Sequence, residues 1–212
     1  MTNAHRTQPI LDAVSLEVVA LEVLSRGPLP FDDEAAMIEV DFAALQYAAT
    51  LAESSGLRVH CNVEYATLVL APGLINDRIK PGIVVELVER HAIFQQPDIY
   101  RWIAREVAQI RRRGALVAMD DVTSTTLERE LIKALRPDLI KVENRDALME
   151  VCRLVKRIPI IAERIETGRH AELARELGAA QLQGYWCDRI AQPRLAQIVP
   201  SSAGGPFVLA PA

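Results

Sequence analysis

Short apolar runs alternate along this chain with longer stretches whose apolar residues recur at helical spacing. Six of the runs have the length of a buried strand and end in polar residues, and they cover residues 18–22, 58–62, 83–86, 115–121, 139–143 and 158–163. The amphipathic stretches predict helices over residues 32–54, 98–113, 127–135, 146–156 and 169–177. Asp32 or Asp33 is expected to cap the first helix, and a last short strand is expected up to Gln183.

Strands that alternate with helices through short links predict a parallel sheet, which a chain of 212 residues can close into a barrel. The length also suits one domain with a sizeable core. We therefore predict an α/β fold, a compact TIM-like (β/α) barrel over residues 1–200. Residues 201–212 are small and contain proline, and they are expected to form a loosely held tail.

Composition and charge exclude several classes of protein. The net charge of −4 gives no basis for binding nucleic acid by charge, so no DNA partner is expected. No run approaches the 18 or more apolar residues of a membrane span, and the first eight residues lack the apolar stretch of a signal peptide. Three widely spaced cysteines favour a reducing compartment. We expect a cytoplasmic protein without a membrane partner.

The polar residues at the strand ends carry the candidate chemistry. In a barrel of this kind the carboxyl ends of the strands meet at one mouth, where the active site lies. Carboxylate and amide oxygens gathered there suit Mg²⁺ or Mn²⁺. Each of these residues taken alone is as well explained by a helix cap, a turn or a surface charge. In chain order the strand ends supply Glu22, Asn62, Glu86, Asp120 with Asp121, Lys141, Glu163 and Gln183.

Matched in order, these segments resemble the EAL domain, the family that hydrolyses the bacterial second messenger cyclic di-GMP. Residues 22–26 stand for the signature Glu-Ala-Leu and the arginine after it, and residues 86–89 for the family's Glu-x-x-Glu. The resemblance runs from Gln8 to about residue 193. The other matching positions are Asn62, the Asp120-Asp121 pair, Lys141, residues 162–167 and residues 183–185.

The resemblance implies a cyclic di-GMP phosphodiesterase with two divalent ions, Mg²⁺ or Mn²⁺. Two ions a few ångströms apart can activate a water and stabilise the oxygens of a displacement at phosphorus. Asp120 would bridge the two ions. One ion would be held by Glu22, Asn62, Glu86 and Asp120, and the other by Asp120, Asp121 and Glu163.

The resemblance also implies roles for other residues. Lys141 would orient the attacking water or neutralise charge on the phosphate, and with Glu22, Glu163 and Gln183 it forms the expected catalytic set. Substrate would contact Arg26, Gln183 and Tyr185. Glu89 would anchor the loop that follows the aspartate pair.

The chain departs from the family pattern in that loop. Active members usually carry Phe-Gly-Thr-Gly-Tyr-Ser-Ser, whereas residues 122–128 read Val-Thr-Ser-Thr-Thr-Leu-Glu. β-Branched residues avoid positive φ, so the loop is expected to follow another path. Residues 143–158 form a shorter segment than usual, as in compact EAL domains attached to HDOD modules. Arg164 stands where a glycine is usual and is expected to point outward.

Two hypotheses about function follow. In the first, the protein is an enzyme that linearises cyclic di-GMP, and the complete set of proposed metal ligands favours it. In the second, it is a catalytically inactive EAL-like domain that acts as a cyclic di-GMP receptor or a protein-interaction regulator, and the loss of both loop glycines favours that. Regulation would come from a homodimer or from a regulatory protein partner.

Overall fold

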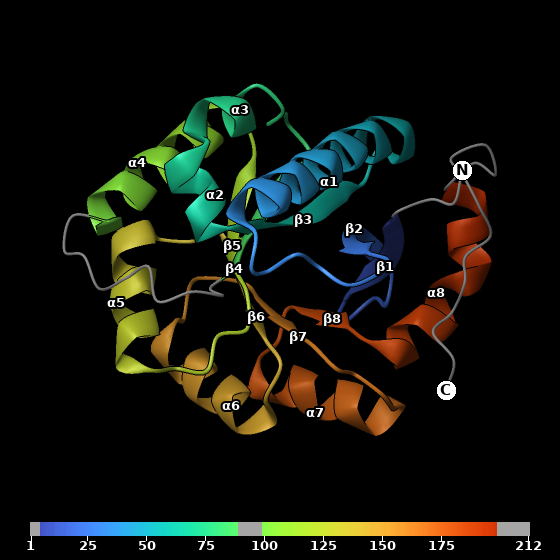
Figure 1. Ribbon diagram of the computed structural model, residues 1–212. Coiled ribbons are helices and arrows are strands. Elements are labelled where there is room, and N and C mark those ends of the chain that lie inside the picture. The colour runs from blue at the N-terminus through green and yellow to red at the C-terminus, as the bar shows by residue number, and fades with distance from the viewer. Residues whose placement is uncertain (1–4, 89–98, 199–212) are drawn as a thin grey trace.

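Eight strands close into a barrel in chain order, with the helices around its outside (Figure 1). The computed structural model describes residues 5–88 and 99–198. This arrangement confirms the predicted TIM-like (β/α) fold. The strands are β1 His5–Asp12, β2 Val18–Ser25, β3 Arg58–Glu64, β4 Ile83–Val88, β5 Leu116–Met119, β6 Leu139–Val142, β7 Ile160–Ala162 and β8 Gln181–Gln183.

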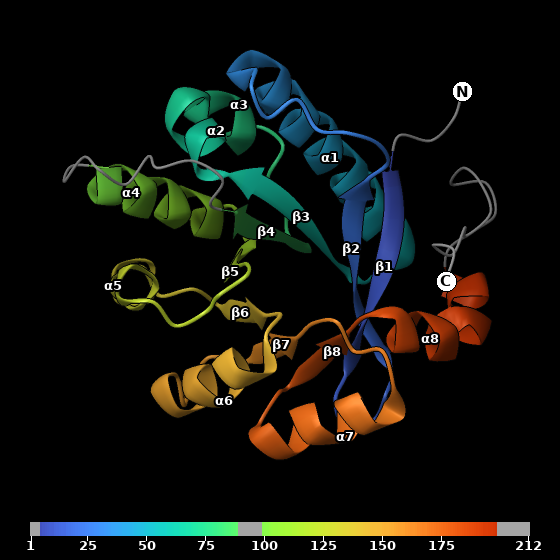
Figure 2. The same cartoon turned by 60° about the horizontal axis from the view of Figure 1, so that its bottom comes forward.

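The helices cover the outer face of the barrel (Figure 2). Of the two candidate caps, Asp33 is the one that accepts a hydrogen bond in the first turn of α1, from the Ala36 amide at 3.0 Å. Gly56 ends that helix with a φ of 69°. The helices are α1 Glu34–Ser55, α2 Tyr65–Leu70, α3 Pro72–Asn76, α4 Ile99–Arg112, α5 Thr126–Leu135, α6 Arg145–Leu154, α7 Gly168–Leu177 and α8 Tyr185–Ile198.

The expectation of a purely parallel sheet is wrong at one strand. β1 runs antiparallel to both of its neighbours, β2 and β8, and closes the barrel between them. Its sequence contains Pro9, and its apolar and polar residues alternate only weakly. Its strand conformation therefore depends on pairing with a neighbour on each side. The short helices α2 and α3 were also not predicted, because six or five residues are too few to show a helical period. The 14-residue α8 was not predicted either, because its apolar residues recur only weakly at helical spacing.

An apolar layer inside the barrel places the polar residues at its mouth. Side chains two residues apart on a strand point to the same face, so each layer residue stands next to a polar one. Ala118, for example, is two residues before Asp120, and Leu139 is two before Lys141. The mouth is therefore built on a closed apolar floor, which consists of Ile10, Ala20, Val84, Ala118, Leu139 and Ile161.

Backbone hydrogen bonds extend the parallel pairing past the ends of two strands, β5 and β7. The Asp120 amide donates to the Leu87 carbonyl at 3.3 Å, and the Glu163 amide donates to the Val142 carbonyl at 2.9 Å. The Val122 amide donates to the Lys141 carbonyl at 3.0 Å. The acids that follow β5 and β7 are thus held by the sheet rather than by free loops.

Two predictions fall on parts of the chain that the structure does not describe. Glu89 and the tail over residues 201–212 lie outside the described residues. Within residues 5–88 and 99–198, no helix combines the length and the apolar character needed to cross a bilayer.

Among the described glycines, Gly184 lies closest to neighbouring backbone; it follows β8 with a φ of 143°. A Cβ atom there would lie 2.3 Å from the Ile165 amide nitrogen and 2.7 Å from its carbonyl oxygen. We expect Gly184→Ala to lower the free energy of unfolding by about 1–3 kcal/mol from backbone strain alone, and further through the clash. Urea unfolding measures this loss. Gly73→Ala is the control, because a Cβ at Gly73 meets nothing within 4 Å; equal stability of the two variants would contradict the prediction.

Candidate metal-binding site

The ammonium group of Lys141 lies at the bottom of the mouth, among four carboxylates from four different strands or strand ends. Its side chain is 1% exposed. Burying one cation with four acids leaves an excess of negative charge in a region of low dielectric constant. The distances from Nζ are 3.2 Å to Glu22 Oε2, 3.0 Å to Glu86 Oε2, 3.2 Å to Asp120 Oδ1 and 3.0 Å to Glu163 Oε1.

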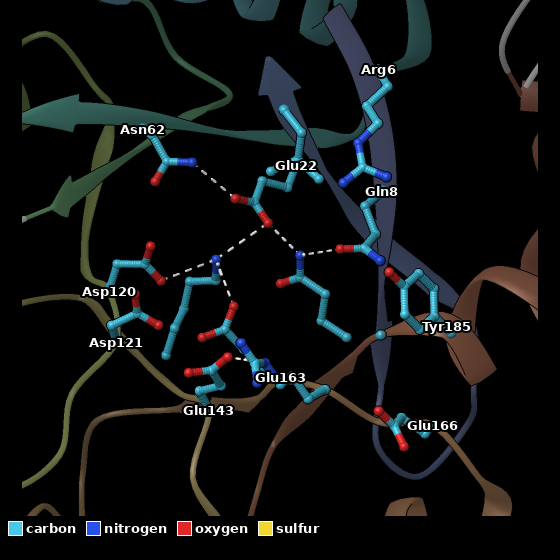
Figure 3. A pocket seen from close by; sticks show the side chains of 15 residues that line it. Arg6, Gln8, Glu22, Asn62, Asp120, Asp121, Glu143, Glu163, Glu166 and Tyr185 are labelled. Atoms are coloured by element: carbon cyan, nitrogen blue, oxygen red, sulfur yellow. Dashed lines mark hydrogen bonds and ion pairs between the residues drawn. The ribbon is translucent and has the colours of Figure 1, made fainter. Parts of the chain in front are cut away.

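Glu22 on β2 is further held by two amide side chains. Asn62 Nδ2 donates to Glu22 Oε1 at 3.0 Å, and Gln183 Nε2 donates to Glu22 Oε2. Gln183 Nε2 also donates to Gln8 Oε1 at 3.0 Å, which connects β8 to β1 (Figure 3). The predicted residues Glu22, Asn62 and Gln183 therefore form one network.

Glu86 lies beneath this network and does not reach the cavity. Its side chain is fully buried, with Oε2 on Lys141 and Oε1 hydrogen-bonded to His60 Nδ1 at 2.6 Å. His60 is two residues before Asn62 and shares its face of β3. Sequence reasoning assigned no role to His60, although this alternation was visible.

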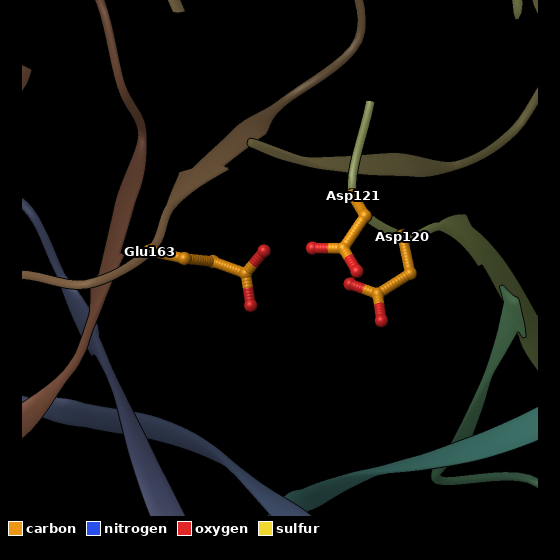
Figure 4. A group of neighbouring side chains, drawn as sticks. All are labelled: Asp120, Asp121 and Glu163. Atoms are coloured by element: carbon orange, nitrogen blue, oxygen red, sulfur yellow. The ribbon is translucent and has the colours of Figure 1, made fainter. Parts of the chain in front are cut away.

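Three acids lie above Lys141, where the mouth opens. Each of Asp120, Asp121 and Glu163 offers an oxygen, and these oxygens lie within 4.8 Å of one another (Figure 4). They face a cavity of about 560 Å³ (Figure 3). The cavity is also lined by Arg6, Gln8, Glu22, Leu24, Asn62, Lys141, Glu143, Arg164, Glu166, Gln183, Gly184 and Tyr185.

The crowded charges shift the pKa values of the buried groups in opposite directions. Burial lowers the pKa of Lys141, but Glu22, Glu86, Asp120 and Glu163 outweigh it and raise that pKa well above the usual value. Burial raises the pKa of Glu22, but the Lys141 ammonium and the Gln183 hydrogen bond outweigh it and lower that pKa to about 2. The Lys141–Glu22 pair is therefore fully charged at neutral pH.

The pKa values of the remaining acids are raised. Burial raises the pKa of Glu163 to about 8 against the pull of Lys141, and Asp120 adds to the rise. Burial also raises the pKa of Asp120, and it raises that of Glu86 well above its usual value. Burial and then Lys141 lower the pKa of His60 to about 3, so its ring is neutral. The site carries protons that a divalent ion would displace.

Of the residues expected to contact substrate, Tyr185 lines the cavity and Arg26 does not. Tyr185 lines the cavity and is 50% exposed. Arg26 follows the last residue of β2, is exposed, and is absent from the lining of the cavity. Arg6 and Gln8, which the sequence did not single out, line it instead because the antiparallel β1 carries them there.

Arg164 has a φ of 49°, a left-handed conformation that fits the glycine usual at this position. Its side chain is 74% exposed, as an outward position would require, but it also lines the cavity, where it forms an ion pair with Glu143. Glu143, the residue after β6, thus reaches the cation at position 164.

The loop after the aspartate pair is held by its own hydrogen bonds. Glu128 accepts from the backbone amides of Thr123 at 3.0 Å and Thr125 at 2.6 Å, and Thr125 caps α5. Positive φ occurs at Asp121 (51°) and Ser124 (72°), and at none of the β-branched positions. The stiff residues thus keep ordinary backbone conformations.

The donor set fits a hard divalent cation. Among the described residues, buried acceptor oxygens without a hydrogen-bond partner include Asn62 Oδ1, Glu163 Oε2 and Gln183 Oε1. Such orphaned oxygens are costly unless a cation or water satisfies them. Together with the oxygens of Asp120 and Asp121, they form the all-oxygen environment that Mg²⁺ and Mn²⁺ prefer.

The comparison with protein families is decisive. The model of the EAL domain matches residues 5–190. The chain belongs to the EAL domain family. Among curated proteins, none matches the sequence.

Solved EAL domains share the fold of this one at low identity. The EAL domain of Mycobacterium smegmatis DcpA is 20% identical with a TM-score of 0.70, over 94% of this chain and 98% of that one. Klebsiella pneumoniae BlrP1, as a manganese and cyclic di-GMP complex, is 18% identical with a TM-score of 0.70, over 86% of this chain. Bacillus subtilis YkuI, in complex with substrate cyclic di-GMP and calcium, is 20% identical with a TM-score of 0.70, over 92% of this chain.

This EAL domain is shorter than several of the chains it resembles. It spans 54% of the BlrP1 chain, 59% of the YkuI chain and 61% of the EAL enzyme Bd1971. The likeness to these structures establishes the fold.

The central role of Lys141 predicts a large effect of removing its charge. We expect Lys141→Met to lower the free energy of unfolding by about 3–5 kcal/mol, because the buried carboxylates lose their shared counter-ion. Added Mn²⁺ should restore part of the loss by replacing that charge. Lys80→Met is the control, since the exposed Lys80–Glu53 pair contributes about 0–1 kcal/mol. Similar losses in the two variants would show that Lys141 has no special role.

The raised pKa of Glu163 predicts that acid stabilises the metal-free protein. Between pH 4.5 and about 8 the folded state keeps a proton that the unfolded state has lost, so the free energy of unfolding falls as pH rises. Each such proton contributes up to about 1.4 kcal/mol per pH unit. Urea unfolding between pH 5 and 8 measures this slope. It should be shallower in Glu163→Gln; an unchanged slope in that variant would remove Glu163 as its source.

Proposed function

We propose that this EAL domain is a phosphodiesterase of bacterial second-messenger signalling that hydrolyses cyclic di-GMP to the linear dinucleotide. The observation that carries the proposal is the convergence of Asp120, Asp121 and Glu163 oxygens within 4.8 Å at an open cavity. A pure scaffold has no need of acids crowded at the cost of raised pKa values. BlrP1, YkuI and Bd1971, whose structures contain cyclic di-GMP, support this ligand class.

The proposed cofactors are two divalent ions, Mg²⁺ or Mn²⁺, as in the sequence-based hypothesis. Asp120, Asp121 and Glu163 would hold one ion, and Glu22, Asn62 and Asp120 would contribute to the other. Bound ions would supply activation of water and charge stabilisation at phosphorus. In the structure, one oxygen of Glu86 is bound to His60 and the other to Lys141. Glu86 could therefore join the second set of ligands only if one of these contacts were broken.

The protein's own groups then have distinct tasks. The Lys141 ammonium is a fixed point charge directed at the reacting region, where it would stabilise negative charge that develops on the phosphate. Glu163 Oε2 is buried and without a hydrogen-bond partner among the described residues, and its carboxyl has a pKa of about 8. This oxygen is free to contact a bound divalent ion, which is the role that Glu163 has in the proposed metal set.

The altered loop does not favour an inactive receptor. The Val122 amide bonds to the Lys141 carbonyl, and Glu128 holds Thr123 and Thr125, so the Asp120-Asp121 pair is fixed without glycines. A rigid support of this kind is what a preorganised site requires. The loop supports the enzyme hypothesis by another structural route.

Turnover is tested with purified protein, cyclic di-GMP and Mg²⁺ or Mn²⁺, followed by chromatography of the nucleotides. We expect the linear dinucleotide to form, and we expect Asp120→Asn to lower the rate by roughly 10²–10³ because it removes charge that both ions share. Asp32→Asn is the matched control: Asp32 is exposed before α1, and its rate should equal that of the wild type. Binding of cyclic di-GMP without any product would instead identify a receptor.

A further inference from the structure

One position of the layer that forms the apolar floor holds a histidine. Each floor residue stands two positions from a polar residue of the mouth, and on β3 that position, two before Asn62, is His60. The register of the strands places His60 opposite Val84, which is a floor residue. The side chain of His60 is 1% exposed. A buried imidazole is costly unless its polar atoms are hydrogen-bonded, so this residue needs a partner that an apolar residue would not.

The partner of His60 is the carboxylate of Glu86. His60 Nδ1 lies 2.6 Å from Glu86 Oε1, and both side chains are closed to solvent. This is the short distance of a strong hydrogen bond. The other oxygen, Oε2, lies 3.0 Å from Lys141 Nζ. Glu86 is therefore held at one oxygen by the floor and at the other by the cation of the mouth.

The two contacts of Glu86 differ in how a bound divalent ion would affect them. The ammonium at Glu86 Oε2 also contacts Glu22 and Asp120, which are proposed ligands of the same ion. An ion held by these oxygens would compete with the ammonium, because two cations at one group of oxygens repel each other. His60 lies at the other oxygen of Glu86 and does not compete. When the carboxylate is ionised, as a metal ligand must be, Nδ1–H of His60 can donate to it.

We infer that His60 is a positioning residue of the metal site, which holds Glu86 Oε1 in the floor while Oε2 exchanges Lys141 for a divalent ion. The inference rests on the proposed metal set for the role of Glu86 as a ligand, and not on hydrolysis. Carboxylates that ligate a metal are themselves held by hydrogen bonds to outer partners, which fix their orientation. Without the imidazole, the Glu86 carboxylate would lose the contact that keeps Oε2 directed toward the mouth.

The test measures Mn²⁺ binding to the metal-free protein by calorimetry, without nucleotide. His60→Leu, which fills the floor but cannot donate a hydrogen bond, should raise the Kd of one bound ion about tenfold to a hundredfold. His60→Gln, whose amide can donate to Oε1, should recover part of this loss. His5→Ala is the matched control and should keep the wild-type Kd, because His5 is a buried histidine at the start of β1 that stacks on Tyr47.

A double variant shows whether His60 acts through Glu86. Glu86→Gln should weaken binding of the same ion because it removes the charge of a ligand. Adding His60→Leu to this variant should then cause little further loss, whereas a purely structural role for His60 would give losses that add. Each Kd is measured well below the melting temperature of the variant, so that loss of the fold is not counted as loss of affinity.

Three results would overturn the inference: wild-type Mn²⁺ affinity in His60→Leu, no recovery in His60→Gln, or additive losses in the double variant. A lowered melting temperature of His60→Leu with unchanged Mn²⁺ affinity would assign His60 to packing of the floor alone. Wild-type protein that binds Mn²⁺ without hydrolysing cyclic di-GMP would refute the proposed activity and leave the inference intact. Wild-type protein that binds no Mn²⁺ would overturn both.

Discussion

The contact of one buried ammonium with four carboxylates is the constraint on which the rest of this site depends. Lys141 links β2, β4 and the ends of β5 and β7 at a single point. One positive charge cannot balance four negative ones, so the surplus is relieved by protons, as the raised pKa values of Glu163 and Glu86 record. A divalent cation would relieve the same surplus, which makes metal affinity a direct consequence of how the barrel is closed.

Closure of the barrel brings the polar residues at the strand ends together into one site. Each polar residue at the mouth stands two positions from an apolar residue of the floor, so the packing that closes the barrel also directs the acids upward. The antiparallel β1 makes an addition of another kind. It brings Arg6 and Gln8 to an edge otherwise formed by strand ends, and so adds a cation to the lining of the cavity.

The structure accommodates the two departures from the family pattern, the loop over residues 122–128 and Arg164, through local contacts. In the loop after the aspartate pair, Asp121 and Ser124 have positive φ, and the β-branched residues do not. Glu128 fixes this loop by accepting hydrogen bonds from the backbone amides of Thr123 and Thr125. Arg164 adopts a backbone conformation suited to glycine at a cost of about 1–2 kcal/mol. Its ion pair with Glu143 partly offsets this cost at the rim of the cavity.

Local patterns were enough to predict the alternation of strands and helices, and with it the barrel, because the period of side chains along a strand or helix is a local property. The same patterns predicted that polar strand ends converge, and these are Glu22, Asn62, Asp120, Asp121, Lys141, Glu163 and Gln183. Contacts between distant strands placed Glu86 under the cavity against His60 and brought Arg6, but not Arg26, into the lining of the cavity. These outcomes depend on the pairing of β1 with two distant strands and on competition among acids for one ammonium. Both arise from contacts between residues far apart in the chain, which no local pattern encodes.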